Sequence, residues 1–158
     1  MDMTGEYRIA APRPKVWDAL NDPSILRQCI PGCEEIEKLS DTEMTARIMA
    51  RVGPLKARFA GKVRLCDLDP PNGYRITGEG SGVRAGFAKG GATVRLGDDG
   101  GGTLLSFTVD AQVGGKLARY SSRFINAVAR KMANDFFGRF SEVLSASPPV
   151  PTPLAGVP

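Results

Sequence analysis

The sequence predicts an α+β fold in which a curved antiparallel β-sheet wraps around one long C-terminal α-helix, with two short helices after the first strand. Much of the chain alternates apolar and polar residues with a period of two, which is typical of half-buried strands. From about residue 115 the period becomes three or four, which indicates an amphipathic helix. At 158 residues, 42% of them hydrophobic, the chain suits one domain with a core of its own. We place that domain at residues 1–145 and a proline-rich, disordered tail at 146–158.

The first elements are a strand and two short helices. Residues 3–9 alternate apolar residues or glycine with polar ones, which predicts a strand. The segment APRPKVWDALNDPSILRQC follows, and Pro14 suits the first turn of a helix. Asn21 or Asp22, beside Pro23, ends this helix and caps the second one. The apolar residues of the two helices are Val16, Trp17, Leu20, Ile25, Leu26 and Ile30.

Two cysteines flank a Pro-Gly pair in the stretch CIPGCEEIEKL, which begins at Cys29. With no histidine in the chain and only one other cysteine, Cys66, a zinc site lacks ligands. Three residues separate Cys29 from Cys33, whereas the cysteines of a redox C-x-x-C pair are separated by two. We therefore interpret both as small apolar side chains at a junction between helix and strand, and we expect no metal site.

The residue pattern in the middle of the chain predicts a series of antiparallel strands. Alternation over 42–52 and 55–65, on either side of a Gly-Pro pair, is typical of a hairpin with one apolar and one polar face. Turn sequences rich in Gly, Pro, Asn and Asp then delimit three further expected strands, at 74–80, 86–96 and 103–113.

The polar face of the hairpin is basic. Its cationic residues are Arg47, Arg51, Lys56, Arg58, Lys62 and Arg64. Such a row is either a solvated sheet surface or an electrostatic docking surface for an acidic partner or an anionic lipid. No aromatic side chains that could stack on bases are interleaved with these charges, so we do not expect nucleic acid binding.

Glycines gather on the inward-facing positions of the later strands. These are Gly78, Gly80, Gly86 and Gly90. A glycine inside a strand weakens it and often marks the close approach of something else. The volume they leave is either filled by large side chains of the long helix or forms a ligand cavity between helix and sheet. The stretch GSGVRA has the spacing of a dinucleotide-binding motif, but a strand pattern follows it and not the helix that such a site requires.

The C-terminal helix is expected to span about 28 residues, or about 42 Å. Its apolar stripe includes Phe124, Val128 and Phe136. On the opposite side we expect a basic cluster, formed by Lys116, Arg119, Arg123 and Arg130. The whole net charge of +4 arises from residues 115–145, because the first 114 residues sum to zero. A surface patch whose charges all have the same sign favours association with an oppositely charged partner.

Groups suited to catalysis are few. Without histidine, acid–base chemistry would depend on a carboxylate, a lysine or a tyrosine inside the cavity. Glu79 and Asp110 fall on polar, outward-facing positions of their strands. We therefore expect no catalytic residue.

Several phrases of the sequence resemble the G-subunit family of carbon monoxide dehydrogenase, within the START-like helix-grip (SRPBCC) superfamily. They include PGCEEIEKL, GPLKARFAGKVRL, PPNGYRITGEGSG, GFAKGGATVRL and VGGKLARYSSRFINAVARKMANDFF, and together they extend over about residues 2–145. The resemblance implies a helix-grip fold and a non-catalytic accessory protein of a molybdenum hydroxylase. It also implies binding of an apolar ligand, such as a quinone or a lipid, and a part in recruiting the enzyme to the cytoplasmic membrane.

These expectations define two sets of site residues. The ligand cavity is expected to involve Trp17, Phe59, Ile76, Gly78, Gly80, Gly86, Gly90, Phe107, Phe124, Val128 and Phe136. The surface for partners is expected at Lys116, Arg119, Arg123 and Arg130, and the partners are the other components of the dehydrogenase and the membrane surface. No tightly bound cofactor is expected.

The alternative class is a small hydrolase or cyclase that uses the same cavity, as some helix-grip proteins do. The shortage of catalytic groups favours the accessory role. The N-terminal stretch MDMTGEYR has no apolar signal-peptide core, and no apolar run is long enough to span a membrane. The expected location is therefore the cytoplasm, with a peripheral position at the inner face of the cell membrane.

Overall fold

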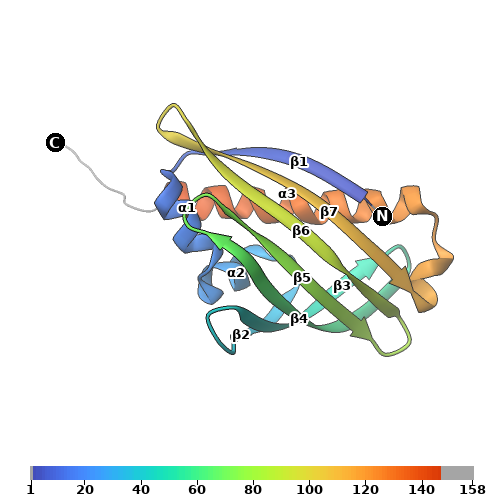
Figure 1. Ribbon diagram of the computed structural model, residues 1–158. Coiled ribbons are helices and arrows are strands. Elements are labelled where there is room, and N and C mark those ends of the chain that lie inside the picture. Colours follow the sequence, from blue (N-terminus) through green and yellow to red (C-terminus); the bar gives the residue numbers. More distant parts are fainter. Residues whose placement is uncertain (1, 147–158) are drawn as a thin grey trace.

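The computed structural model describes residues 2–146 and confirms the expected α+β fold, with a seven-stranded sheet and a long C-terminal helix (Figure 1). The elements, in chain order, are β1 (Asp2–Ile9), α1 (Arg13–Leu20), α2 (Pro23–Cys29), β2 (Cys33–Lys38), β3 (Glu43–Val52), β4 (Leu55–Asp69), β5 (Gly73–Gly82), β6 (Gly86–Asp99), β7 (Gly102–Gly114), the 3-10 helix η1 (Gly115–Arg119) and α3 (Ser122–Ala146). Apart from Ala146, the tail expected at 146–158 lies outside the described residues.

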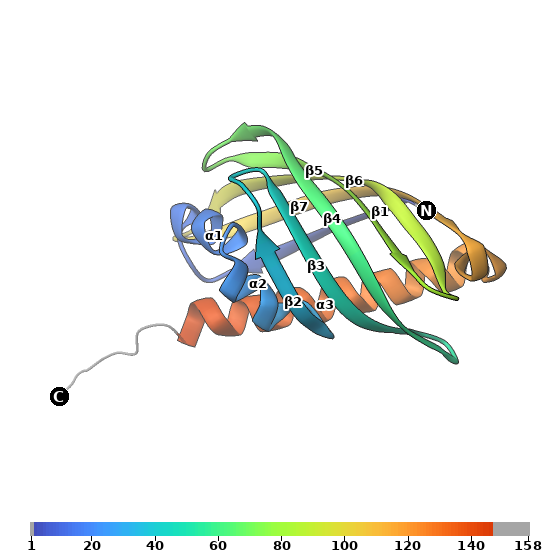
Figure 2. The same ribbon diagram turned by 90° about the horizontal axis from the view of Figure 1, so that it is seen from below.

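The sheet is antiparallel throughout, in the order β1-β7-β6-β5-β4-β3-β2. It curves around α3, so that one face is concave and turned toward the helix (Figure 2). Hydrogen bonds hold α3 against the edge strand β1: the Arg130 guanidinium donates to the Thr4 carbonyl oxygen over 3.2 Å, and the Tyr7 hydroxyl donates to Asn134 Oδ1. The long helix therefore lies across the mouth of the curved sheet, as its apolar stripe requires.

The two short helices begin and end where the sequence predicts. Asp22 is the N-cap of α2, and its side chain accepts a hydrogen bond of 2.9 Å from the backbone N–H of Ser24. Pro23 then occupies the first turn. Both helices lie at the same end of the molecule, where they close the sheet next to the C-terminal part of α3 (Figures 1 and 2).

The cysteine stretch is the expected junction between helix and strand. Cys29 ends α2 and is fully buried, and Cys33 begins β2. Between them Gly32 has φ +73°, and a Cβ there would lie 2.0 Å from the carbonyl oxygen of Met49. Burial raises the pKa of both thiols, so each stays protonated at neutral pH and is a poor metal ligand or nucleophile.

The single helix of about 28 residues is the part of the prediction that was wrong. Residues 115–119 form η1, the backbone is extended at Tyr120, and α3 begins only at Ser122. Gly115 adopts φ +67° at the start of η1, and Ser121 Oγ accepts a hydrogen bond of 3.1 Å from the N–H of Phe124, which caps the first turn of α3. Lys116 therefore lies on η1, outside the long helix.

The apolar interior is divided into two clusters. The larger one lies near α1 and α2 and includes Ile9, Val16, Leu105 and Phe140, each with no exposed surface. The smaller one lies at the opposite end of the sheet, where Val52, Leu117 and Ile125 meet. The space between the two clusters, on the concave face, is where the candidate site lies.

Candidate functional site

A cavity of about 360 Å³ lies on the concave face of the sheet. Strand alternation turns one side chain in two toward it, from β2 through β7. The small residues at these positions are what leave the space open. They include Ala46, Gly61, Gly78, Gly80, Ala88 and Gly90.

The inward-facing lining is apolar. Aliphatic and aromatic side chains such as Met44, Ile48 and Val109 complete it. Four charged residues of the same strands, Lys62, Glu79, Lys89 and Asp110, occupy the alternate positions, so their side chains belong to the convex face. A ligand in the cavity would be held by burial of apolar surface and not by ion pairs.

The structure brings together five of the residues that the sequence predicted for the cavity. Phe59, Ile76, Gly78, Gly80 and Gly90 all line it, from the neighbouring strands β4, β5 and β6. Alternation along each strand was sufficient to find them, because a residue's parity fixes the face on which its side chain lies.

Three other predicted residues belong to the larger apolar cluster. Trp17 packs edge-to-face against Tyr74, with ring centroids 5.3 Å apart. The Phe107 ring lies 5.9 Å from the rings of both Tyr7 and Phe137, and Phe136 packs against the same cluster. They bound the space at the end near α1 without lining the cavity itself.

The last three predicted residues lie at the opposite end. Phe124 and Val128 of α3 pack in the smaller cluster. Gly86 has φ +115° at the turn between β5 and β6, where a Cβ would lie 2.1 Å from the carbonyl oxygen of Gly114. Gly86 therefore serves the turn geometry and does not face the cavity, contrary to the parity argument.

Some small residues that line the cavity were not among the predicted site residues, namely Ala46, Gly61 and Ala88. The signal was available, because all three fall on the apolar parity of their strands. The predicted cavity residues were large apolar side chains and glycines of the later strands, so these three were not included. Small residues at inward positions are nevertheless what create a cavity.

The glycines of the cavity differ in the room around them. A Cβ on Gly80 would lie 3.5 Å from the Ala60 carbonyl oxygen, which is ordinary van der Waals contact. A Cβ on Gly90 would lie 2.1 Å from the Asp110 carbonyl oxygen, which no side chain can tolerate. Gly90 is therefore required by the close approach of β7, whereas Gly80 borders open volume.

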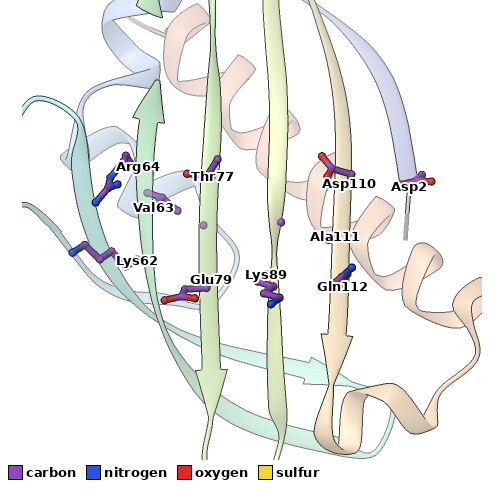
Figure 3. Close-up of a pocket in the computed structure, with 12 residues that line it drawn as sticks. Asp2, Lys62, Val63, Arg64, Thr77, Glu79, Lys89, Asp110, Ala111 and Gln112 are labelled. Carbon is purple, nitrogen blue, oxygen red and sulfur yellow. The ribbon is translucent and has the colours of Figure 1, made fainter. Parts of the chain in front are cut away.

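A second hollow, of about 780 Å³, lies on the convex face of the same strands (Figure 3). Figure 3 shows Lys62, Glu79 and Lys89 side by side across β4, β5 and β6, with Gln112 next in the row on β7 and Asp110 further along that strand. Charges of both signs line this hollow, so an apolar ligand would gain little from entering it. The smaller concave cavity is the better candidate for an apolar molecule.

Most of the basic face of the β3–β4 hairpin is neutralised by acidic neighbours. Arg47 pairs with Glu35 at 2.6 Å, and Arg58 pairs with Glu34 at 2.6 Å. The amino group of Lys62 and the guanidinium of Arg64 both lie within ion-pair distance of Glu43. In the described chain, Arg51 and Lys56, at the hairpin tip, have no such partner.

The four basic residues expected to bind partners do not form one face of one helix. Lys116 and Arg119 lie on η1, Arg123 lies in the first turn of α3, and all three are exposed. Arg130 lies further along α3 and is tethered to β1 through its bond to Thr4. The structure thus brings the first three together at one end and separates the fourth.

Burial or hydrogen bonding shifts the pKa values of Tyr74, Glu34 and Glu43. Tyr74 is 5% exposed, and its burial raises the pKa of its hydroxyl well above the ordinary value of 10.0. Glu34 and Glu43 have lowered pKa values, because each accepts hydrogen bonds from an arginine, and both lie on the outer surface. Within residues 2–146 no group of three His, Cys, Asp or Glu residues is arranged to hold a metal ion.

The helices of residues 2–146 are all too short or too polar to cross a bilayer.

Comparison with solved structures shows the same fold in other proteins. A conserved protein from Geobacillus kaustophilus superposes with a TM-score of 0.88 at 28% identity, covering 93% of this chain and 97% of that one. The Zhui aromatase/cyclase from Streptomyces sp. R1128 superposes with a TM-score of 0.68 at 16% identity, covering 92% and 93%. No curated protein is similar enough to count as a match.

The second likeness shows the fold alone, because its identity is low. The family model for the G subunit of carbon monoxide dehydrogenase (CoxG) matches residues 5–145, nearly the whole described chain. This match agrees with the phrases quoted from the sequence and with the curved sheet around α3. The chain belongs to the G-subunit (CoxG) family of carbon monoxide dehydrogenase.

Proposed function

We propose that this protein is a non-catalytic accessory component of a molybdenum hydroxylase of the carbon monoxide dehydrogenase type. It binds a neutral apolar molecule, such as a quinone, in the concave cavity and helps bring the enzyme to the cytoplasmic membrane. The observation that carries the proposal is an apolar cavity, kept open by small side chains, in a chain of this family.

The chemistry of the lining favours a neutral ligand. A charged group without a partner is costly to bury, and the inward positions of the lining, from Ile36 to Ala111, carry no ionisable side chain. The carboxylate of a fatty acid would therefore have to stay at the mouth, whereas a quinone ring could enter. A quinone is therefore a better candidate ligand than an ionised lipid.

The size of the cavity supports the same ligand class. Ligand pockets commonly measure about 300–1,000 Å³. At about 360 Å³, this cavity accommodates a substituted ring or the end of an aliphatic chain, but not a whole long-chain lipid. A long isoprenoid or acyl tail would extend beyond it.

A hydrolase or cyclase in the same cavity is the alternative, and the fold shared with an aromatase/cyclase is its support. Such chemistry needs a group that exchanges protons near neutral pH. Tyr74, the ionisable side chain buried in the adjacent cluster, stays protonated because its pKa is raised. The accessory role therefore accounts better for the residues present.

The proposal can be tested by loading the purified protein from a bacterial membrane lipid extract. Mass spectrometry of the re-isolated protein should identify a neutral apolar molecule, a quinone above all, at up to one molecule per chain. Recovery of only charged phospholipids, or of nothing above the level bound by an unrelated protein, would contradict it.

A further inference from the structure

Three separate segments of the chain meet at the end of the molecule opposite α1 and α2. They are the β3–β4 turn, the β5–β6 turn, and η1 with the first turn of α3 (Figures 1 and 2). The N–H of Leu117 in η1 donates to the Ala85 carbonyl oxygen over 3.1 Å, which joins the second segment to the third. A Cβ on Gly53 would lie 3.3 Å from the Phe124 ring, which joins the first to the third. We call this region the turn end.

The turn end is basic and contains no acidic residue. Its cationic side chains, all exposed, are Arg51, Lys56, Arg84, Lys116, Arg119 and Arg123. The sequence has no Asp or Glu in 44–66, 80–97 or 111–134. These six charges exceed the net +4 of the whole chain, so the remainder of the molecule is slightly acidic.

Within residues 2–146, the charges at the turn end take part in no ion pair. Nine ion pairs join basic and acidic side chains of the described chain, and none of them involves these six residues. Arg58, further from the tip on the same face, is by contrast paired with Glu34. The nearest carboxylate along the β5–β6 hairpin is that of Glu79, which lies on the convex face three residues before the turn.

An apolar side chain protrudes from the middle of this basic region. Val83, at the tip of the β5–β6 turn, is 88% exposed, and Phe87, near the start of β6, is 44% exposed. The turn places Arg84 at φ +69° and Gly86 at φ +115°. A turn that presents valine next to arginine suits the interface of a bilayer, where apolar groups enter the acyl boundary and cations meet lipid phosphates.

We propose that the turn end docks on an anionic phospholipid bilayer, with Val83 inserted and the six basic side chains on the lipid headgroups. A protein partner would need a matching acidic surface, whereas a membrane needs only charge and a protruding apolar tip. This docking deepens the recruiting part of the proposed function and rests on it. It directs the smaller apolar cluster, which bounds one end of the cavity, toward the lipid.

Co-sedimentation of the full chain with vesicles tests this docking. Vesicles of phosphatidylcholine mixed with phosphatidylglycerol should bind the protein, and vesicles of phosphatidylcholine alone should not. Raising the salt from about 0.1 M to about 1 M shortens the Debye length from about 10 Å to about 3 Å, and binding should fall with it. If the wild-type protein does not bind to anionic vesicles, the proposal is overturned. The partner of this surface would then be an acidic protein.

Charge-reversal variants show which surface of the protein binds the vesicles. Each basic side chain near an anionic bilayer strengthens binding by about fivefold, so Lys56→Glu, Arg84→Glu and Arg119→Glu together should weaken it by more than about 100-fold. The matched control reverses Arg27, Lys38 and Arg139, which are exposed, have no ion pair within residues 2–146, and give the same net charge. Val83→Ser should weaken binding by about tenfold or more through lost apolar burial.

Each outcome decides the proposal. All the changed residues are exposed, so the melting temperatures should stay close to that of the wild type. Binding that survives the reversal at the turn end, or that falls equally with the control, would overturn the docking surface. Neither result affects the ligand test, since vesicle binding is measured without a quinone and the cavity residues are unchanged.

Discussion

Gly80→Leu tests whether the cavity is open and whether it binds the ligand. Gly80 lies on β5, faces the concave side, and lines the cavity. A Cβ there meets the Ala60 carbonyl oxygen at 3.5 Å and the Gly61 Cα at 3.6 Å, both at ordinary contact distances. The rest of a leucine side chain would therefore project into a space of about 360 Å³.

The expected effects on stability and on binding have opposite signs. Full burial of a leucine side chain stabilises a fold by about 1.5–3 kcal/mol, and removal of glycine from a strand interior adds about 0.5–1 kcal/mol. Part of this is offset by imperfect packing, so the melting temperature should be unchanged or raised by a few degrees. Ligand affinity should fall by tenfold or more, because the leucine occupies the volume that the ligand needs.

The assay can use Trp17, the one tryptophan in the chain. It packs against Tyr74, which lies two residues along β5 from the cavity-lining Ile76. Quenching of its fluorescence by a short-chain quinone gives the affinity, with isothermal titration calorimetry as an independent check. Gly97→Leu is the matched control, since Gly97 is exposed on β6 and a Cβ there meets nothing within 4 Å.

Gly90→Leu provides the contrast within the same cavity. The Asp110 carbonyl oxygen would lie 2.1 Å from its Cβ, and the Ala111 Cα would lie 2.6 Å away, so the backbone must move. We expect a loss of about 3 kcal/mol or more, or a failure to fold. If Gly80→Leu lowers the melting temperature by several degrees, or binds quinone as tightly as the wild type, the reasoning about the open cavity is refuted.

Three further changes test other parts of the structure. Gly32→Ala should lower the free energy of unfolding, measured by chemical denaturation, by about 3 kcal/mol. The reason is that Gly32 has φ +73° and a Cβ there would lie 2.0 Å from the Met49 carbonyl oxygen. A change within about 0.5 kcal/mol would contradict the turn geometry. The double variant Cys29→Ala and Cys33→Ala should lose about 1–2 kcal/mol of unfolding free energy. Elemental analysis should detect no zinc or iron, and stoichiometric metal in the wild type would refute the packing role. Glu43 has a lowered pKa, chiefly through its hydrogen bond from Arg64, so its contribution to stability is present above its ordinary pKa of 4.5 and is lost as the pH falls below that value. Glu43→Gln should therefore flatten the fall in melting temperature below about pH 4.5, and an unchanged acid profile would argue against the pair.

The order and type of the elements could be predicted from the sequence because they depend on local patterns. The alternation in β3 and β4 fixes which side chains face the core, since a shift by one residue would expose the whole apolar set. The cap at Asp22 and the turn at Gly32 are equally local, because each depends on the residues next to it. Five cavity residues followed from the same parity, as did the absence of a helix after GSGVRA.

Where an apolar stripe ends could not be read from its period. The apolar pattern runs without interruption from Leu117 to Phe140. The helical conformation is nevertheless interrupted at Tyr120, where the backbone is extended. The break depends on contacts distant in sequence: the N–H of Leu117 donates to Ala85, and the Phe124 ring packs near Gly53. Those contacts draw η1 toward the strand turns, and with it Lys116 and Arg119.

Residues that look alike in the sequence have different roles in the folded protein, and these roles depend on the tertiary structure. Gly80, Gly86 and Gly90 are alike in the sequence, but one borders open volume, one makes a turn, and one admits the backbone of β7. The basic residues are likewise alike in the sequence, but the fold sets Arg58 beside Glu34, whereas Arg84 at the turn end has no ion pair within residues 2–146. The physical reason is that parity and period specify a face of one element, whereas volume and charge pairing depend on distances between elements that only the folded chain establishes.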